Sequence, residues 1–146
     1  MDLTATYMFE APVERVWELL MDTDAVGSCL PGCRGLHPIG PDRYEVDLAV
    51  AVAAVSGSFK GTVSVADKIA PHSYTLIVDG SGRQGFVKGE ARITLEADGD
   101  RTRVLVAAQA DVGGLIARLG QRLLEGVGRM TMDKFYGCLA QRVASS

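Results

Sequence analysis

The sequence has 146 residues, the usual size of one folded domain, so we expect a single domain over residues 1–146. Fifteen Lys and Arg residues against 18 Asp and Glu residues give a formal net charge of −3, without blocks of one sign. This composition excludes the basic stripe of a nucleic-acid-binding protein and indicates no strongly charged partner.

No segment of the sequence predicts a membrane-spanning helix. The longest apolar run, residues 48–55, has eight residues, whereas spanning a bilayer takes roughly 20. The N-terminal residues Met1–Thr4 lack the basic and apolar regions of a signal peptide. We therefore expect the protein in the cytoplasm.

The three cysteines, Cys29, Cys33 and Cys138, are odd in number and irregularly spaced, which is not the pattern of a disulfide framework. Cys29 and Cys33 do not predict a zinc site, because His37 and His72 supply no second ligand pair at a suitable spacing. We expect small buried or loop thiols, no metal and no other cofactor.

The N-terminal segment predicts a strand followed by two short helices. Leu3–Phe9 alternates and is rich in β-favouring residues. A helix begins at Ala11-Pro12, because proline is tolerated at the first helical position. Asp22 or Asp24 can cap a second helix, which ends near Gly27, before the turn of the next Pro-Gly pair. The apolar stripe of the first helix comprises Val13, Val16, Trp17 and Leu20.

From residue 44 onward, apolar residues recur with period two, which predicts strands. Polar residues such as Glu45 and Lys60 belong to the opposite face. Turns are expected at Ser56-Gly57 and Gly80–Gly85, among others. One apolar and one polar face on consecutive strands is typical of an antiparallel sheet covered on one side. The strands run through Tyr44–Val52, Phe59–Val65, Tyr74–Val78, Val87–Leu95 and Val104–Ala110.

The last segment, from about Leu115 to Val143, has helical periodicity and is long enough to cross the whole sheet. Its apolar side comprises Ile116, Leu119, Leu123, Val127 and Met130. Its glycines are Gly120, Gly126, Gly128 and Gly137. Each glycine costs roughly 0.5–1 kcal/mol relative to alanine in a helix. Close packing on the sheet and adaptation to a variable guest are two explanations that both stay open.

This order of elements predicts an α+β fold in which a curved antiparallel sheet wraps around the long helix. The inferred inner face carries no Asp, Glu, His, Lys or Cys, and its polar atoms come chiefly from Tyr44 and Tyr74. Tyrosine, with an ordinary pKa of about 10, is a poor general base. A closed, dry core is the alternative to a cavity. The inner face is mostly Val, Ala and Gly, however, which favours an apolar cavity that binds a molecule without transforming it.

Two further motifs have structural explanations. Gly80–Gly85 matches the G-x-G-x-x-G pattern of dinucleotide sites, but a strand follows it where such a site needs a helix, so we expect a hairpin loop. The segment Cys29–Cys33 contains a Pro-Gly pair and predicts a turn that stops the second helix. The alternative for this turn is a cavity rim, with Leu30 and Pro31 pointing at the guest.

These segments together resemble the family of carbon monoxide dehydrogenase G subunits, within the START-like, polyketide-cyclase-like (SRPBCC) superfamily. Ala11-Pro12 followed by Val16-Trp17 is common to the superfamily, whereas Leu30-Pro31-Gly32 is more specific to the family. The other matching stretches are Asp22, Gly57–Gly61, Gly80–Gly89 with Ala91, and Gly113–Ala117.

The resemblance implies a helix-grip (START-like) fold, in β-α-α-β(5–6)-α order, with a hydrophobic cavity. Members of this family are encoded with molybdenum-containing hydroxylases, and they are associated with attachment of that enzyme to the membrane and with lipid-like quinones. Longer members carry a C-terminal extension associated with the membrane, and this sequence ends at Ser146. The implied partners are an apolar small molecule, an oxidoreductase and, through peripheral contact, the inner face of the membrane.

We therefore expect an accessory protein that binds a quinone- or lipid-like molecule for a molybdenum-containing hydroxylase of the carbon monoxide dehydrogenase type, with no catalytic residues of its own. One alternative is a cyclase- or hydrolase-type enzyme, and another is an assembly or interaction protein without a ligand. The expected ligand-binding residues are Trp17, Leu30, Pro31, Tyr44, Leu48, Val50, Phe59, Val63, Tyr74, Leu76, Val78, Leu119, Leu123, Val127 and Met130.

Overall fold

The computed structural model of the protein describes residues 1–52 and 55–145. Within these ranges, a strand and two short helices come first, six strands follow, and two helices complete the chain. The elements are β1 (Asp2–Phe9), α1 (Val13–Leu20), α2 (Thr23–Cys29), β2 (Cys33–Gly40), β3 (Arg43–Val52), β4 (Val55–Ile69), β5 (Ser73–Gly82), β6 (Gly85–Asp98), β7 (Arg101–Gly113), the 3₁₀ helix η1 (Leu115–Leu119) and α3 (Gln121–Ser145).

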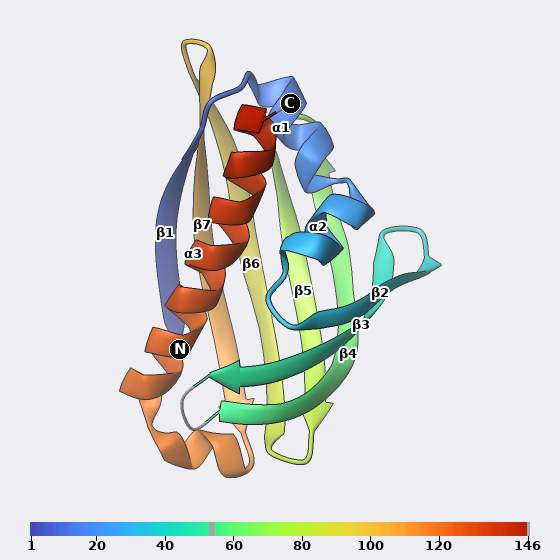
Figure 1. Ribbon diagram of the computed structural model, residues 1–146, viewed down its shortest axis with the longest axis vertical. Coiled ribbons are helices and arrows are strands. Elements are labelled where there is room, and N and C mark those ends of the chain that lie inside the picture. Colours follow the sequence, from blue (N-terminus) through green and yellow to red (C-terminus); the bar gives the residue numbers. More distant parts are fainter. Residues whose placement is uncertain (53–54, 146) are drawn as a thin grey trace.

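The described strands form one antiparallel sheet in the order β1-β7-β6-β5-β4-β3-β2. The first strand of the chain therefore pairs with the last, and the others follow one another in chain order. Figure 1 shows the sheet curling around α3, with α1 and α2 beside α3 on the same concave side. This arrangement confirms the expected helix-grip fold. No described helix combines the length and the apolar character that crossing a membrane requires.

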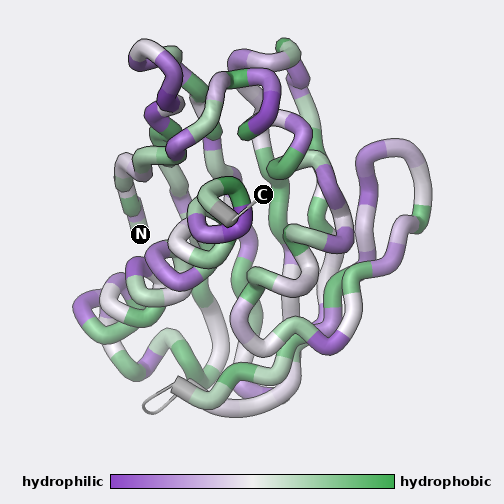
Figure 2. Tube along the Cα trace, turned by 45° about the horizontal axis from the view of Figure 1, so that its top comes forward, coloured by the Kyte–Doolittle hydropathy of each residue, from purple (hydrophilic) through white to green (hydrophobic). Residues whose placement is uncertain are grey.

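Cross-strand pairing places the apolar residues on the concave face. Tyr44 lies opposite Val63, which in turn lies opposite Val78, and at the other side of the sheet Ile93 lies opposite Val106. Because side chains alternate along a strand, the charged neighbours of these residues point outward. Figure 2 shows the same principle in the helix, where hydrophilic and hydrophobic residues alternate along α3.

Glycines occupy positions on this face where neighbouring strands come very close. Gly61 lies opposite Gly80, and a Cβ atom added to Gly61 would lie 2.1 Å from the carbonyl oxygen of Asp79. A Cβ atom added to Gly89 would lie 2.5 Å from the carbonyl oxygen of Gln109. Neither position accepts a side chain unless a strand moves. The concave surface therefore stays bare of side chains there.

The buried core lies where α1, α2 and the C-terminal half of α3 cover the sheet. Its largest fully buried apolar residues are Phe9, Val16, Ile93, Val104 and Leu139. Burying one such side chain contributes about 1.5–3 kcal/mol. Thr102 is also fully buried, and its hydroxyl donates a hydrogen bond of 2.8 Å to the carbonyl oxygen of Ala11. This bond fastens β7 to the connection between β1 and α1.

Tyrosine rings extend the core. Tyr7 and Tyr136 are stacked with ring centroids 4.6 Å apart, and Trp17 packs edge-on against Tyr74 at 5.5 Å. Burial raises the pKa of Tyr74 and of Tyr136 above the ordinary value of 10.0. The pKa of Tyr7 is raised by burial and by the hydrogen bond that its hydroxyl donates to Asp133 at 2.7 Å. All three hydroxyl groups therefore stay protonated near neutral pH.

The long C-terminal helix begins later than expected. Gly120 has a φ of +91° and separates η1 from α3, so the segment from Leu115 to Val143 is two helices and not one. Glycine adopts this conformation more readily than residues that carry a side chain. The N–H of Leu124 donates to the carbonyl of Gly120 at 3.2 Å, which starts the first turn of α3. Gly120 is therefore a joint, and it lies outside the regular helix.

The glycines inside α3 do not share one explanation. A Cβ atom on Gly128 would lie 2.8 Å from Cδ1 of Leu3, so Gly128 lets α3 approach β1 closely. Gly126 and Gly137 are exposed, and a Cβ atom on either would meet no described atom within 4 Å outside the helix itself. Close packing thus accounts for Gly128, and adaptation of the helix remains the open explanation for the other two.

The expectation of small free thiols is wrong for two of the three cysteines. Cys29, the last residue of α2, forms a disulfide with Cys138 of α3, with Cα atoms 5.5 Å apart. Cys33 is the free thiol. The paired residues are 109 positions apart in the chain. Only the packing of α2 on α3 brings them together, and no spacing pattern in the sequence encodes that packing.

The strand boundaries also differ from expectation at two places. β2 has no counterpart among the predicted strands, because Gly35 and Pro38 interrupt its alternation and because it is a largely exposed edge strand. Val52 pairs with Val55, so Ser56 and Gly57 lie within β4 and not in a turn. Gly80–Gly85 is a hairpin as predicted, although the strands continue to Gly82 and resume at Gly85.

The two short helices follow the prediction with small shifts. Pro12 is the residue before the first helical position of α1, and helix ends commonly differ by one residue. Asp22 caps α2, and its Oδ1 atom accepts hydrogen bonds from the N–H groups of Asp24 and Ala25 at 3.0 and 3.2 Å. The helix ends at Cys29, two residues beyond the expected Gly27.

Replacing exposed glycines of α3 is expected to stabilise the protein. Gly126→Ala and Gly137→Ala should each raise the free energy of unfolding by about 0.5–1 kcal/mol, because alanine is the better helix former and the added methyl group meets open space. Urea denaturation followed by circular dichroism measures the change. Gly61→Ala is the contrasting variant and should destabilise, because its methyl group would collide with the backbone of β5. A gain at Gly61, or losses at both helix positions, would contradict these packing assignments.

Stability is expected to fall as the pH rises above about 10. The pKa values of Tyr74 and Tyr136 are higher in the folded protein than in the unfolded chain, so the unfolded state loses these protons first. The stabilising effect is complete below pH 10 and declines by about 1.4 kcal/mol per pH unit for each tyrosine, until the pH passes the folded pKa. Free energies of unfolding between pH 8 and 11 should fall less steeply for Tyr136→Phe than for the wild type. Equal slopes would show that this hydroxyl is not buried.

Candidate ligand-binding site

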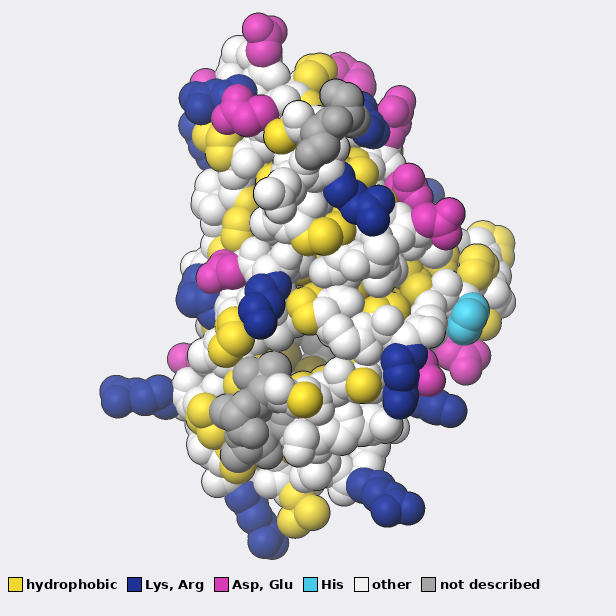
Figure 3. Space-filling model, in the orientation of Figure 1, with side chains coloured by type: hydrophobic (Ala, Val, Ile, Leu, Met, Phe, Trp, Pro, Cys, Tyr) yellow, Lys and Arg dark blue, Asp and Glu magenta, His cyan; other side chains and the backbone are white. Residues whose placement is uncertain are grey.

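The half of the concave face away from the core is lined by apolar side chains that pack incompletely. Leu48 of β3, Phe59 of β4 and Val78 of β5 remain partly exposed, as do Leu123 and Val127 of α3. Positions of the same kind at the core end are fully buried. Figure 3 shows a hollow on this side of the molecule, between α3 and β3, with hydrophobic side chains at its edge.

Two features of the fold leave this space unfilled. The bare backbone at Gly61, Gly80 and Gly89 removes side chains that would otherwise project from the sheet. In addition, the backbone of α3 packs on β1, α1 and α2, whereas β3 and β4 lie at the far side of the curled sheet (Figure 1). The N-terminal half of the helix therefore lies over a concave surface that it does not fill.

The connection between α2 and β2 packs on β3 beside the hollow. The carbonyl oxygen of Gly32 accepts a hydrogen bond from the N–H of Ala49 at 2.8 Å. Gly32 has a φ of +76°, and a Cβ atom on it would lie 2.0 Å from the carbonyl oxygen of Ala49. A glycine is therefore required at this turn. The connection holds the half-buried Leu30 and Pro31 next to Val50, on the adjacent residue of β3.

Most of the predicted ligand-binding residues lie around this hollow, although ligand contact itself remains a prediction. On the strands, partly exposed concave-face residues are Tyr44, Leu48, Val50, Phe59, Val63 and Val78. On the helical side and at the α2–β2 connection, half-buried residues are Leu119, Leu123, Val127, Leu30 and Pro31. They come from several elements that the sequence alone could not place in contact.

The remaining predicted residues lie elsewhere. Tyr74 is only 3% exposed and belongs to the core, and Trp17 and Leu76 pack against that core. These three residues form the floor between the filled and the unfilled halves of the concavity. Met130 is 41% exposed, so it is not on the covered side of α3. The covered side instead continues through Tyr136 and two further buried residues, Leu139 and Val143.

The chemistry available at the hollow is that of an apolar surface with a few hydroxyl groups. At the concave positions of the described strands, the register places no Asp, Glu, His, Lys or Arg. β2 brings Cys33 opposite Leu48, and the thiol donates a hydrogen bond to the carbonyl oxygen of Gly35 at 3.4 Å. This thiol is missing from the predicted site, because β2 itself is missing from the predicted strands.

Nothing in the described part of the chain is arranged to hold a metal ion. No group of three or more His, Cys, Asp or Glu side chains comes together there. Within the same residues, every buried side-chain nitrogen or oxygen atom has a hydrogen-bond partner. The buried tyrosine hydroxyls remain protonated because burial raises the pKa of Tyr74 and Tyr136. The site therefore offers hydrogen bonds and apolar contact.

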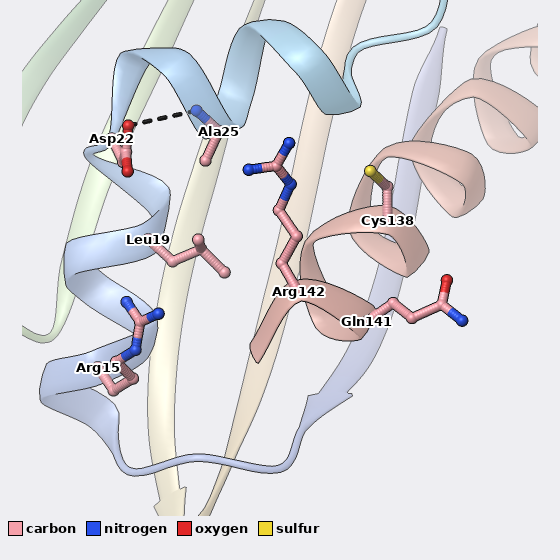
Figure 4. A pocket seen from close by; sticks show the side chains of 7 residues that line it. All are labelled: Arg15, Leu19, Asp22, Ala25, Cys138, Gln141 and Arg142. Atoms are coloured by element: carbon pink, nitrogen blue, oxygen red, sulfur yellow. Dashed lines mark hydrogen bonds between the residues drawn. The ribbon is translucent and has the colours of Figure 1, made fainter. Parts of the chain in front are cut away.

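A second depression lies outside the concavity, between α1, α2 and the C-terminal part of α3. Its volume is about 580 Å³, and Leu19 and Ala25 are its buried residues. Figure 4 shows the side chains of Arg15 from α1 and Arg142 from α3 at its sides, with Cys138 beside them. No local pattern in the sequence predicts this depression, because it depends on how three helices pack.

Comparison with known proteins agrees with the fold. No curated protein matches the chain. A conserved protein from Geobacillus kaustophilus, of solved structure, is 34% identical with a TM-score of 0.97, over 100% of this chain and 97% of that one. A START superfamily protein from Mycobacterium smegmatis is 16% identical with a TM-score of 0.78, over 99% and 97% of the two chains.

The fold is shared with an enzyme as well. The Zhui aromatase/cyclase from Streptomyces sp. R1128 is 16% identical with a TM-score of 0.72, over 99% of this chain and 93% of that one. At this level of identity the likeness shows the fold alone. The model of the CoxG family, the G subunits of carbon monoxide dehydrogenase, matches residues 7–144, nearly the whole sequence. The chain therefore belongs to the CoxG family of carbon monoxide dehydrogenase G subunits, with a START-like fold.

Proposed function

We propose that the protein binds an apolar, quinone- or lipid-like molecule in the hollow between α3 and the strands β3, β4 and β5. The observation that carries this proposal is the set of apolar side chains there that remain partly exposed, including Leu48, Phe59 and Val127. Covering them removes apolar surface from water, at about 25 cal/mol per Å². Membership of the CoxG family and the START-like fold support the same function.

The polar groups near the hollow suit one end of such a molecule. Tyr44 is half-buried on the concave face and can donate one hydrogen bond, as a quinone carbonyl or an ester oxygen would require. A pocket with mostly apolar walls and a few oriented polar groups is typical of small-molecule sites. We therefore infer that Tyr44 orients the polar end of the ligand while the aliphatic residues cover the remainder.

The enzymatic alternative needs a group that can move a proton at the hollow. The described concave positions supply tyrosine hydroxyls, and these are poor bases at neutral pH. The aromatase/cyclase among the similar structures shares the fold, which by itself carries no activity. Binding without chemistry is therefore the function that we propose.

The name of the family supports a protein partner. We propose that the protein serves as an accessory to a molybdenum-containing hydroxylase of the carbon monoxide dehydrogenase type. A bound quinone would then be an electron acceptor that the accessory protein presents to that enzyme. The interaction is testable by co-purification of the two proteins with and without added quinone.

Quinone binding is expected to quench the fluorescence of Trp17, which is the single tryptophan and packs against Tyr74 at the floor of the hollow. Titration with decylubiquinone should give saturable quenching with a stoichiometry near one. Val78→Phe fills the hollow from β5 and should weaken binding at least about tenfold, which corresponds to about 1.4 kcal/mol.

The matched control for that experiment is Ile77→Phe. Ile77 is the preceding residue of the same strand, and it is 43% exposed on the opposite face. Its substitution adds a ring of the same size without entering the hollow, so binding should be unchanged. Equal losses in the two variants, or no quenching by quinone in the wild type, would count against the proposed site.

A carrier of a lipid-like molecule must exchange it with a bilayer, so we also propose peripheral contact with the inner face of the membrane. The segments 49–52, 55–61, 81–88 and 112–124 meet at the end of the sheet nearest the hollow. All the charged residues in them are basic, although the whole chain has a net charge of −3. They are Lys60, Arg83, Lys88, Arg118 and Arg122, and all are exposed.

Exposed apolar side chains lie among these cations. Phe86 is 41% exposed and Leu115 is 55% exposed, and Nζ of Lys88 lies 5.9 Å from the centroid of the Phe86 ring. Figure 3 shows Lys and Arg side chains projecting at the lower end of the molecule, while Asp and Glu side chains lie higher. Basic residues around apolar tips fit the interface of an anionic bilayer.

Removing two of these charges is expected to weaken membrane binding. Arg83→Gln with Arg118→Gln should lower the affinity for vesicles containing phosphatidylglycerol about 30-fold, from roughly 1 kcal/mol for each cation near the surface. Vesicle co-sedimentation measures the affinity, and vesicles of phosphatidylcholine alone should bind weakly. Lys134→Gln is the control, since Lys134 is an exposed cation in the middle of α3. Binding that does not depend on lipid charge would contradict the proposed surface.

A further inference from the structure

The disulfide and the second depression are parts of one arrangement. Cys138 lines the depression of about 580 Å³ between α1, α2 and α3 and is partly exposed there. Its partner Cys29 is only 5% exposed and lies in the core cluster. A thiol that enters the depression therefore reaches the sulfur of Cys138, whereas the sulfur of Cys29 is shielded.

The charges around this sulfur favour an anionic visitor. Arg142 follows Cys138 by four residues on α3, so both side chains lie on the same face of the helix. Arg15 of α1 lines another wall (Figure 4), and no ion pair holds it within the described part of the chain. Asp22 also lines the depression, but its carboxylate accepts hydrogen bonds from two N–H groups of α2.

We propose that the Cys29–Cys138 disulfide is a thiol-exchange site, entered through this depression by a small thiol that carries carboxylate groups. Arg15 and Arg142 attract the carboxylates and place the thiolate at the accessible sulfur. Thiolate attack is the step by which a disulfide opens, and its rate depends on access and on which sulfur is attacked. Cationic neighbours also stabilise the thiolate that leaves.

The exchange is balanced in two steps. In the first, the incoming thiolate forms a bond to Sγ of Cys138, the bond between the two protein sulfurs breaks, and Cys29 leaves as a thiolate that takes up a proton. In the second, another thiol attacks the mixed disulfide, which releases Cys138 as a thiol and the two small molecules as their own disulfide. The protein disulfide is reduced by two electrons and the two small thiols are oxidised.

Reduction would change how the hollow is held. Cys29 is followed directly by Leu30, so the disulfide anchors to α3 the connection that packs on β3 beside the hollow. After reduction, the hydrogen bond that Arg142 donates to Ser28 still links this end of α2 to α3. This consequence rests on the proposed ligand function: the reduced protein should release a bound apolar molecule faster.

The exchange site is tested by the rate of reduction with two thiols of opposite charge. Cys33 is first blocked with iodoacetamide, the protein is exposed to glutathione or to cysteamine at matched thiolate concentration and low salt, and newly formed thiols are counted by mass spectrometry after labelling with N-ethylmaleimide. Glutathione should react at least threefold faster than cysteamine with the native protein.

Paired variants identify the cause of that preference. Arg15→Gln with Arg142→Gln should bring the ratio of the two rates close to one, while Arg118→Gln with Arg122→Gln, at the other end of the fold, should leave it unchanged. Arg15→Gln alone tests the same effect without disturbing the contact to Ser28, and circular dichroism verifies folding. Equal rates for the two thiols in the wild type, or no reduction without denaturant, would overturn the proposal.

The control of ligand release is measured separately, as the dissociation rate of decylubiquinone from the oxidised and the reduced protein. A rate at least threefold higher after reduction supports the coupling, and equal rates overturn it. If decylubiquinone binds to neither form, the proposed ligand function and the coupling both fail. The exchange site is still judged by the reduction rates, because these need no bound ligand.

Discussion

The structure depends on a mismatch between a deeply curled sheet and a single helix. Close strand approaches at Gly61 and Gly89 leave backbone where side chains would otherwise project, and α3 packs on the β1 side of the concavity. One helix laid at one side of such a surface fills half of it. The filled half becomes a dry core around Ile93 and Leu139, and the other half keeps an incomplete apolar lining.

The two halves have different mechanical character. At the core end, the buried Thr102, the stacked Tyr7 and Tyr136 and the disulfide of Cys138 tie strands and helices together. At the hollow end, α3 begins at the joint of Gly120 and contains an exposed glycine that packing does not require. The fold thus joins a fixed floor to a wall that can adjust, which suits a ligand whose size varies.

Much of the fold follows from periodicity in the sequence. Alternation in β3 to β7 places their apolar residues on one face, and Asp22 marks the start of α2, because both signals are local and both agree with the final packing. β2 escapes prediction because Gly35 and Pro38 hide its pattern, and as an edge strand it needs little apolar character. The break at Gly120 escapes because the apolar period continues through it.

The candidate site is less predictable than the fold. Its strand residues, such as Leu48 and Val78, are recognisable as concave-facing from alternation alone. Which of them border open space depends on how far α3 covers the sheet, and this separates buried Tyr74 from half-exposed Val78 on the same strand. The disulfide and the depression beside Cys138 depend on helix packing alone, and a single sequence carries no local signal for either.

A crystal structure of the protein grown with decylubiquinone tests the central claim most directly. We predict electron density for the quinone ring between α3 and the concave faces of β3, β4 and β5, in contact with Phe59 and Leu123. Density for the quinone at any other place, or a hollow closed by the protein's own side chains, would contradict the claim.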